Sequence, residues 1–412
     1  MRLDAVIFGG GAAGLWLLDR LSRQGCQAVL LEAEALGSGQ TIGSQGIIHG
    51  GLKYTLQGWL TKSAQHIRKM PDVWRRALLG QIAPNLTRTR LRSDCCYLWR
   101  TDSLASRAGM IGARIGLQVT PEYVEGADRP EVLATVSGTV ARIAEQVIQP
   151  GSYLNDLATQ YRDRILQIDA ANGVAFELRS PGEVAAVRLT DPSSGRTLKL
   201  LPRQVIFTAG AGNAALRGQV GLSSAVMQRR PLQMVLCRGR LPELNGHCVD
   251  GLKTRVTITS DCDADGRTVW QIGGQLAEDG VSLTPQQLVD HAALELRAVL
   301  PMLDLSDAEW STYRVDRAEG ATDDGNRPET IQVLCAGNVT TGWPTKLALA
   351  PVLADEIAGR IQPAAGRVEF DPAAITDWPR PSVAPHPWEE RSRAWWQPTQ
   401  RPAKPQPNRR AA

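Results

Sequence analysis

The amino-terminal segment places the strongest constraint on the fold. An apolar run at residues 5–8 leads directly into three spaced glycines, Gly9, Gly11 and Gly14. Residues 15–21 then carry a helical pattern, and a second apolar run at residues 28–31 ends on Glu32. The order strand, turn, helix, strand and acid is that of a dinucleotide-binding unit. Its glycines allow, in turn, a tight turn, close approach of the backbone to a pyrophosphate, and close packing of helix on strand.

The chemistry of this unit follows from its helix. The helix N-terminus offers unpaired N–H groups and the positive end of a dipole to phosphate groups. The Glu32 carboxylate can accept hydrogen bonds from a ribose hydroxyl. We therefore predict a bound dinucleotide, held by Gly9, Gly11, Ala12, Ala13, Gly14 and Glu32.

Length and cysteine usage set the broad class. A chain of 412 residues can form two domains with a large core. The 7 cysteines are odd in number and scattered, without C-x-x-C spacing, which argues against a disulfide framework or a zinc site and for a reducing compartment. The first apolar run is short and reads as a strand rather than a signal peptide, and no run has the length of a membrane span. We expect a cytoplasmic protein without a bound metal.

The positive charge of the chain lies in its tail. Residues 377–412 contain seven basic and three acidic residues, and the whole chain has a formal net charge of +4. Residues 1–376 are therefore formally neutral, so nucleic acid is not expected as the main ligand.

Two later apolar runs end in glycines like the first one, at residues 205–213 and 331–338. Between them the chain is rich in short strand patterns. This order predicts an α/β fold in which a Rossmann-type cofactor-binding domain is interleaved with a substrate domain rich in antiparallel sheet. We assign residues 1–80, 149–230 and 329–362 to the cofactor-binding domain, residues 81–148 and 231–328 to the substrate domain, and residues 363–412 to a tail.

The tail is rich in proline, which excludes a regular helix, and carries Trp378, Trp388, Trp395 and Trp396. One interpretation is a largely disordered extension. The other is an extended arm that docks its tryptophans on a protein partner or on the body of the chain.

Residues 44–54 carry a family resemblance. The run Ser44-Gln45-Gly46-Ile47-Ile48-His49-Gly50-Gly51-Leu52-Lys53-Tyr54 is similar to the Ile-His-Gly-Gly-Leu-Arg-Tyr run of flavin-dependent glycerol-3-phosphate dehydrogenases. Over residues 1–362 the pattern of motifs resembles the D-amino-acid-oxidase-like superfamily of FAD enzymes, which includes glycine oxidase, sarcosine oxidase and L-2-hydroxyglutarate dehydrogenase. The chain departs from the superfamily at residues 340–346, where the Gly-rich run is replaced by Thr-Thr-Gly-Trp-Pro-Thr-Lys. It also lacks the additional C-terminal domain of the glycerophosphate enzymes.

The resemblance implies that FAD is the cofactor. Glu32 would hold the adenosine ribose, Gly210 would approach the adenine side, and Gly337 and Thr345 would face the ribityl chain and the pyrimidine end of the flavin. The loop along the pyrophosphate and the flavin would contribute Ser38, Gly39, Thr41, Ser44, Gln45, Gly46 and His49. The sequence leaves open whether FAD is covalently attached.

The resemblance also suggests catalytic residues. His49 would lie beside the flavin, where an imidazole could orient substrate or take a proton near neutral pH; the alternative is a histidine that only packs against the ring. Lys53 and Tyr54 are further candidates, although the sequence favours ordinary residues at a helix start for both.

Residues 310–325 are similar to the superfamily's Trp-x-Gly-x-Arg…Asp-Gly segment, whose arginine binds a substrate carboxylate in several members. The distance from Trp310 favours Arg314, whereas the distance to Asp324 and Gly325 favours Arg317. A guanidinium suits this role because its fork pairs two oxygens. The arginine that is not the ligand would form a surface ion pair with Asp316 or Glu319.

Lys346 resembles a lysine that sarcosine-oxidase-like members place after the last strand to hold a carboxylate. It could instead stabilise the reduced flavin, or be a solvated residue at a helix start.

These features predict an FAD-dependent oxidoreductase that transfers a hydride from a carbon bearing a hydroxyl group to the flavin. The expected substrate is small and anionic, either a 2-hydroxy acid or a polyol phosphate, with an amino acid or secondary amine as the alternative. The electron acceptor stays open between oxygen, a quinone and a protein. A rival of another class is a non-catalytic FAD-binding protein that docks a protein partner through residues 377–412.

Overall fold

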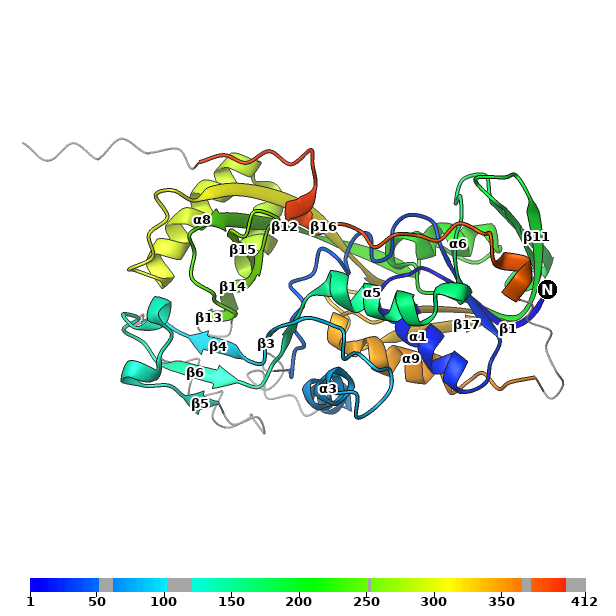
Figure 1. The fold of residues 1–412 in the computed structure, drawn as a ribbon, viewed down its shortest axis with the longest axis horizontal. Helices are drawn as coiled ribbons and strands as arrows, with labels where there is room; N and C mark the ends of the chain where they lie inside the picture. Colours follow the sequence, from blue (N-terminus) through cyan, green and yellow to red (C-terminus); the bar gives the residue numbers. More distant parts are fainter. Residues whose placement is uncertain (52–61, 102–120, 251–252, 365–371, 398–412) are drawn as a thin grey trace, which may run out of the picture.

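The computed structural model describes residues 1–51, 62–101, 121–250, 253–364 and 372–397. They form two lobes that lie side by side along the long axis of the molecule (Figure 1). Each lobe is built on one large sheet. Within these ranges, no helix has both the length and the apolar character needed to cross a membrane.

The first lobe contains the amino-terminal unit. Its parallel strands have the order β18-β11-β1-β2-β8, with bounds Val339–Trp343, Thr197–Phe207, Arg2–Phe8, Ala28–Glu32 and Ile165–Gln167. Both faces of this sheet are covered, as its continuous apolar runs require. Helices α1 (Ala12–Arg23), α9 (Ala350–Ala358) and α5 (Pro150–Gln160) share one apolar core on one face.

Strand β11 pairs with one neighbour in the antiparallel direction and with another in the parallel direction. Its first half is antiparallel to β10 (Glu183–Thr190), which in turn pairs with β9 (Val174–Ser180). Its second half, residues 201–207, is parallel to β1. The expected antiparallel ribbon and the expected buried strand are therefore joined in one continuous strand.

The expectation of a buried strand over residues 331–338 is wrong. Residues 332–336 form β17 (Gln332–Ala336), an antiparallel edge strand with two exposed positions. The chain turns at Gly337, whose φ is +56°, and returns as β18. The buried parallel strand next to β11 is β18, in which all five residues are buried.

The second lobe is built on an eight-stranded sheet with the order β16-β12-β15-β14-β13-β4-β6-β5. The bounds in this order are Glu309–Gly320, Met227–Gly239, Thr268–Gly273, Lys253–Cys262, Gly246–Asp250, Cys96–Trp99, Val140–Ile143 and Glu122–Tyr123. Helix α8 (Pro285–Val299) begins at a capping box formed by Thr284 and Gln287, and its apolar side is part of the core of this lobe. The long strands β12 and β16 run from the second lobe toward the first (Figure 1).

Shorter elements complete the fold. They are α3 (Lys62–Leu78), β3 (Leu91–Ser93), β7 (Val147–Ile148), α6 (Asn213–Gln219) and α7 (Gln275–Asp279). The arrangement confirms the predicted α/β fold, in which a parallel, Rossmann-type sheet is interleaved in sequence with a sheet-rich second part.

The tail docks on the body of the chain over residues 372–397. Trp378 is buried in the core of the first sheet, and its Nε1 donates to the Gln167 carbonyl (2.7 Å). Trp388 lies in a cluster with residues of β12 and β16 in the second lobe. Trp396 exchanges two backbone hydrogen bonds with Trp310 (2.7 and 2.9 Å). The segment thus crosses from one lobe to the other (Figure 1), and a disordered extension is wrong for this part of the tail.

We predict that Trp378→Ala lowers the free energy of unfolding by about 3–5 kcal/mol, because it removes a fully packed indole and a hydrogen bond. Urea denaturation of the full chain measures the change. Met302→Ala serves as the control, since Met302 is 74% exposed and its replacement should change stability by less than about 0.5 kcal/mol. If both variants matched the wild type, the docked tail would contribute nothing to stability.

Candidate functional site

Two glycines of the amino-terminal turn are required by close backbone contacts. A Cβ at Gly9 would lie 2.4 Å from Ala209 Cα, and the φ of Gly9 is +104°. A Cβ at Gly14 would lie 2.0 Å from the Gly9 carbonyl oxygen. By contrast, a Cβ at Gly11 would meet only Thr41 Oγ1, at 3.2 Å. The turn is therefore packed tightly against β11 and α1, but it is open at Gly11, the position expected to approach a pyrophosphate.

Glu32 is held beside this turn. Its Oε2 accepts a hydrogen bond from the Gly10 N–H (2.6 Å), and its Oε1 accepts one from the Glu34 N–H (2.9 Å). Burial raises the pKa of Glu32, and these N–H donors oppose the rise. The carboxylate is thus fixed at the end of β2, in the place where the fingerprint requires a ribose acceptor.

The loop from Gly37 to Gly51 continues the same edge of the sheet. Thr41 Oγ1 accepts a hydrogen bond from the Ala12 N–H (3.3 Å), and the buried Ser44 Oγ has no partner in the described structure. A Cβ at Gly39 or Gly210 would meet no atom within 4 Å, although both have positive φ. Open backbone and an unpartnered hydroxyl around a helix N-terminus fit a large phosphate-containing cofactor. Ser38, next to Gly39, is exposed.

Two other loop residues are engaged by the protein itself. Gln45 Nε2 donates to the carbonyls of Thr257 (3.1 Å) and Gln271 (2.9 Å), and Arg92 donates to the Gln45 carbonyl. A Cβ at Gly46 would lie 2.0 Å from the Ile148 carbonyl oxygen. The side chain of Gln45 and the glycine at position 46 therefore hold the loop, and contact of their backbone with the cofactor stays a prediction.

His49 lies at the end of this loop in a cluster with Glu145 and His247. Its Nδ1 is 3.3 Å from Glu145 Oε2, and His247 Nε2 is 3.9 Å from the same oxygen. Glu145 Oε1 accepts from the Gly50 N–H (2.5 Å). The His49 side chain keeps 37% of its surface exposed, whereas Glu145 keeps only 5%. The sequence predicted no metal ligands, yet these three residues offer ligand atoms within 4.8 Å of one another.

The protonation of this cluster follows from burial and charge. Burial lowers the pKa of His49 to about 4, against the raising effect of Glu145 and with a further lowering by Lys346 and His247. Burial opposes ionisation of Glu145, but the adjacent His247 and the hydrogen bond with His49 hold its pKa below the ordinary value. At neutral pH His49 is therefore a neutral imidazole beside a buried carboxylate.

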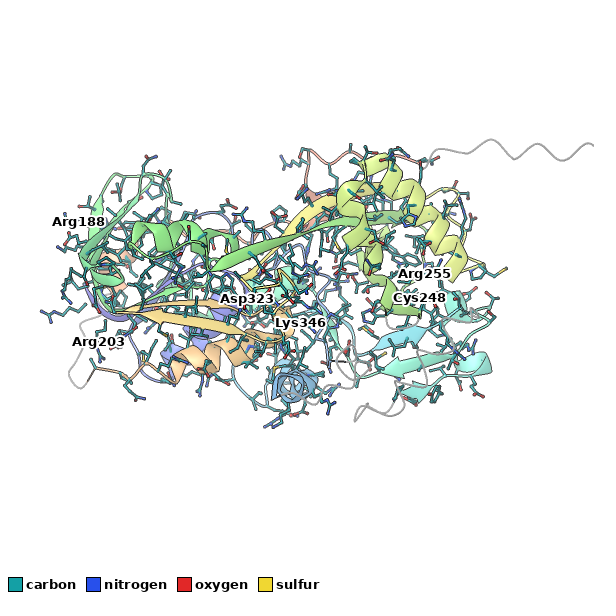
Figure 2. All side chains as sticks on the ribbon, turned by 180° about the vertical axis from the view of Figure 1, so that it is seen from behind. Arg188, Arg203, Cys248, Arg255, Asp323 and Lys346 are labelled. Carbon is teal, nitrogen blue, oxygen red and sulfur yellow. The ribbon has the colours of Figure 1, made fainter. Side chains whose placement is uncertain are left out.

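Thr345 and Lys346 follow β18 at its carboxyl end. Thr345 has φ +55°, a strained conformation for a β-branched residue and one that is often found at functional sites. Lys346 lies where the two lobes meet (Figure 2), and its charge acts on His49. The parallel register puts this end of β18 on the same edge as Gly9 and Gly210.

Gly337 lies at the other end of the sheet. It forms the turn that precedes β18, and a Cβ there would lie 2.4 Å from the Gly182 carbonyl oxygen. This contact explains the glycine, so its assignment to the flavin's ribityl chain is a wrong expectation. The error arose because β17, the antiparallel edge strand, reads like a buried parallel strand in sequence.

The two candidate arginines lie on opposite faces of β16. Arg314 is exposed and its Nε is 3.4 Å from Asp316 Oδ1, which is the surface ion pair expected for the arginine that is not the ligand. Arg317 is half-buried, on the face that carries Tyr313, and its Nη1 is 3.2 Å from Glu278 Oε1. Tyr313 contacts the loop directly by donating to the Gly43 carbonyl (2.7 Å). The structure therefore favours Arg317 over Arg314, while Lys53 and Tyr54 lie outside the described residues.

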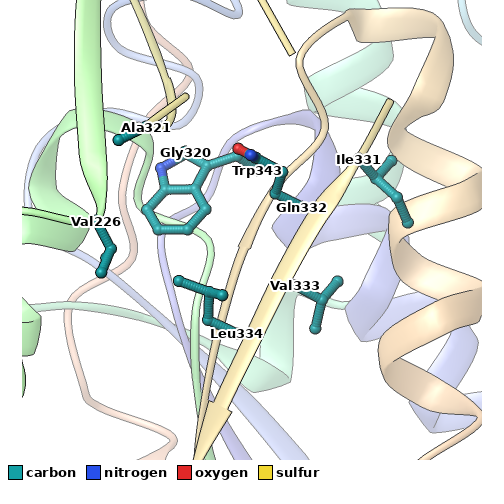
Figure 3. A pocket seen from close by; sticks show the side chains of 8 residues that line it. All are labelled: Val226, Gly320, Ala321, Ile331, Gln332, Val333, Leu334 and Trp343. Carbon is teal, nitrogen blue, oxygen red and sulfur yellow. The ribbon is translucent and has the colours of Figure 1, made fainter. Parts of the chain in front are cut away.

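A pocket of about 470 Å³ opens beside the hairpin of β17 and β18 (Figure 3). Its walls come from the ends of β12 and β16, from β17 and from Trp343, with lining residues Val226, Gly320, Ala321, Ile331, Gln332, Val333, Leu334 and Trp343. Trp343 Nε1 and Gln332 Oε1 are buried without partners among the described residues. The pocket therefore has mainly apolar walls, with two unpartnered polar atoms buried behind them.

Sequence reasoning missed Glu145, His247, Arg92 and Gln271. Each lies in an ordinary strand or loop pattern, and each reaches the site only through tertiary contacts. The one available signal was a lone glutamate, Glu145, within the apolar run before Gln149-Pro150.

Comparison with known proteins identifies the family. The model of the DAO family, described as FAD-dependent oxidoreductase, matches residues 4–355. A probable FAD-dependent oxidoreductase of Pseudomonas aeruginosa is 39% identical over 395 residues, which cover 94% of this chain and 98% of that protein. A crystal structure of an FAD-dependent oxidoreductase from the same organism matches with a TM-score of 0.79 and 35% identity, over 94% of this chain and 98% of that one.

More distant structures share the fold. L-α-glycerophosphate oxidase from Mycoplasma pneumoniae with FAD bound matches with a TM-score of 0.62 and 12% identity, over 89% of this chain and 97% of that one. Glycine oxidase from Geobacillus kaustophilus matches with a TM-score of 0.61 and 16% identity, over 93% and 99%. The chain belongs to the DAO family of FAD-dependent oxidoreductases. FAD is its cofactor, and the open glycine cradle and Glu32 described above fit that group.

We predict that Gly14→Ala lowers the FAD content of the purified protein, because the new methyl group would push α1 away from the Gly9 turn. Overpacking of this kind typically costs about 1–3 kcal/mol. The ratio of flavin to protein absorbance measures occupancy. Gly218→Ala is the matched control, since a Cβ at this position in α6 meets no atom within 4 Å. Full FAD occupancy in Gly14→Ala would contradict the assignment of this turn.

Proposed function

We propose that the protein oxidises a carbon bearing a hydroxyl group in a small anionic substrate, either a 2-hydroxy acid or a polyol phosphate. FAD supplies the acceptor for a hydride and its two electrons. The observation that carries the proposal is the position of His49 at the end of the cofactor loop, partly exposed and 3.3 Å from the buried Glu145 carboxylate, with the charge of Lys346 acting on it.

His49 is suited to act as the general base. Burial keeps its pKa at about 4, so the imidazole has an available lone pair throughout the neutral range. Its Nδ1 faces Glu145, and its partial exposure leaves the ring accessible. A base of this kind would take the hydroxyl proton while the hydride leaves the carbon.

Lys346 and Arg317 are suited to bind the anionic group. Lys346 follows the strained Thr345 at the carboxyl edge of the sheet. Arg317 is half-buried, and burial lowers its pKa, with Arg230 adding to this effect. Cations that are partly withdrawn from water favour a carboxylate or a phosphate as partner.

Two structural relatives are consistent with different substrate classes. The glycerophosphate oxidase favours a polyol phosphate, in line with the Ile-His-Gly-Gly motif around His49. The glycine oxidase favours an amino acid as the alternative, in line with the resemblance at Lys346. In either case the same base and the same cations would act, because both substrates carry a transferable proton and an anionic group.

A non-catalytic FAD-binding protein with a docking tail is less well supported. Residues 372–397 are packed on the body of the chain, so they are not available as an arm for a protein partner. An anaerobic flavin-reduction screen with glycerol 3-phosphate, 2-hydroxy acids and amino acids separates the classes. Bleaching by one of these compounds supports an enzyme, and its chemical class identifies the substrate.

We predict that Arg317→Gln and Lys346→Gln each weaken binding of the reducing substrate by about 30-fold to several-hundred-fold, the usual effect of losing a charge-assisted hydrogen bond. Arg314→Gln is the matched control on the same strand, and it should bind like the wild type because Arg314 faces solvent. The substrate dependence of anaerobic flavin reduction gives the apparent Kd. Wild-type binding in all three variants would rule out an anionic substrate held by these cations.

We also predict that His49→Gln slows flavin reduction by about 10²–10⁴-fold at pH 7, the usual contribution of a general base. In the wild type the reduction rate should be constant at neutral pH and fall as the pH drops through about 4, where His49 becomes protonated. The glutamine variant should lose this pH dependence. Stopped-flow reduction at saturating substrate measures both effects, and a wild-type rate in His49→Gln would exclude the residue as base.

A further inference from the structure

Glu145 is a buried carboxylate that the proposed mechanism has not yet used. It lies between β6 and β7, and its side chain is 5% exposed. Within the described residues the side chains closest to its oxygens are two histidines, and no Lys or Arg lies within salt-bridge distance. Burying an ionised carboxylate costs free energy unless its oxygens accept hydrogen bonds. The neighbours of Glu145 must therefore donate hydrogen bonds to it.

The contacts of Glu145 determine where those protons lie. Oε1 is satisfied by the Gly50 N–H (2.5 Å), so the backbone next to His49 is attached to the same carboxylate as the ring. Oε2 faces His49 Nδ1 at 3.3 Å. An ionised carboxylate can only accept hydrogen bonds, so the proton of a neutral His49 must be on Nδ1. Nε2 of His49 then carries the lone pair.

His247 supports this arrangement from the second sheet. Its ring lies 5.8 Å from the His49 ring with an interplanar angle of 31°, and its Nε2 is 3.9 Å from Glu145 Oε2. Its Nδ1 is 2.9 Å from Thr257 Oγ1, which fixes the orientation of the ring on β13 and β14. The charged or titratable groups that act on His49 from the described elements are therefore Glu145, His247 and Lys346.

We propose that Glu145 is a positioning residue that fixes the tautomer and orientation of His49, so that His49 Nε2 takes the substrate proton. This inference rests on the proposed function of His49. In the step, the substrate O–H bond breaks and its proton passes to Nε2, the hydride leaves the carbon for FAD, and the C=O double bond forms. The imidazolium that results keeps its Nδ1–H on Glu145, whose charge stabilises it. In the comparable serine-protease arrangement, loss of the orienting carboxylate lowers kcat by about 10⁴.

Glu145→Gln tests the proposal with little change in shape. The amide oxygen can still accept from Gly50, but the amide N–H₂ would then face His49 and favour the proton on Nε2. We expect flavin reduction to slow by at least about 100-fold, with unchanged FAD content. ¹⁵N NMR of histidine-labelled holoenzyme should report the Nδ1–H tautomer for His49 in the wild type and the Nε2–H tautomer in the variant. The chain has 5 histidines, and the His49→Gln spectrum assigns the signal.

Two controls separate the outcomes. Asp156 is also buried (3%) and accepts from the Arg88 N–H and Thr89 Oγ1, so Asp156→Asn removes a buried carboxylate elsewhere and should leave the His49 tautomer unchanged. If His49→Gln is slow while Glu145→Gln keeps the wild-type rate and tautomer, this inference fails and the proposed function stands. If His49→Gln itself reduces at the wild-type rate, the proposed function fails.

The metal content of the purified holoenzyme provides a further test. A stoichiometric zinc ion would overturn the proposal, because a metal bound by His49 Nδ1, Glu145 and His247 would replace the proton on which it depends. A metal-free holoenzyme with the Nδ1–H tautomer is the expected result.

Discussion

The buried Arg92 guanidinium holds the cofactor loop against the rest of the molecule. Its side chain is 2% exposed, it pairs with the fully buried Asp261 on β14 (3.2 Å), and it donates to the Gln45 carbonyl. Removing one partner of such a buried pair typically costs about 3–5 kcal/mol, because the other charge is then left unpaired. The pair therefore joins the second sheet to the loop that carries His49, and the position of the reacting groups depends on it.

A second set of contacts, made of hydrogen bonds between uncharged groups, fixes the same loop. Gln271 Nε2 donates to the Tyr313 hydroxyl (3.0 Å), which in turn donates to the Gly43 carbonyl (2.7 Å). Burial raises the pKa of Tyr313, so this hydroxyl keeps its proton throughout the physiological range. Together with Gln45, these residues attach the loop to β15 and β16 at several points. A loop that is fixed in this way can hold reacting groups in the geometry that a reaction requires.

The parts of the fold that sequence could predict are those fixed by local pattern. The unit from β1 to Glu32 was predicted correctly because turn, helix cap and acid follow one another within about thirty residues. The β17–β18 hairpin was not, because an apolar run of five to eight residues has the same pattern whether it is parallel and central or antiparallel at an edge. Gly337 was misplaced for that reason.

The candidate site shows the same limit. His49 was found through a motif, but Glu145 lies 96 residues from His49 in sequence and contacts it only in the folded chain. The sequence could not decide between the two arginines of β16. Because side chains alternate between the faces of a strand, residues three positions apart lie on opposite faces of the sheet, and only the structure shows which face is exposed. The tail was equally ambiguous until its tryptophans were placed on both lobes.

The charges around His49 meet two opposing requirements of the general base that we propose it to be. Burial and Lys346 disfavour the protonated ring and keep the base neutral before reaction, whereas Glu145 favours that ring and stabilises the imidazolium once the proton has arrived. If Glu145 were absent, Lys346 would leave a base too weak to hold the proton. If Lys346 were absent, the proposed anionic substrate would lose one of the two cations assigned to it. The carboxylate and the ammonium group therefore act on one imidazole in opposite directions, as the proposed proton transfer from a negatively charged substrate requires.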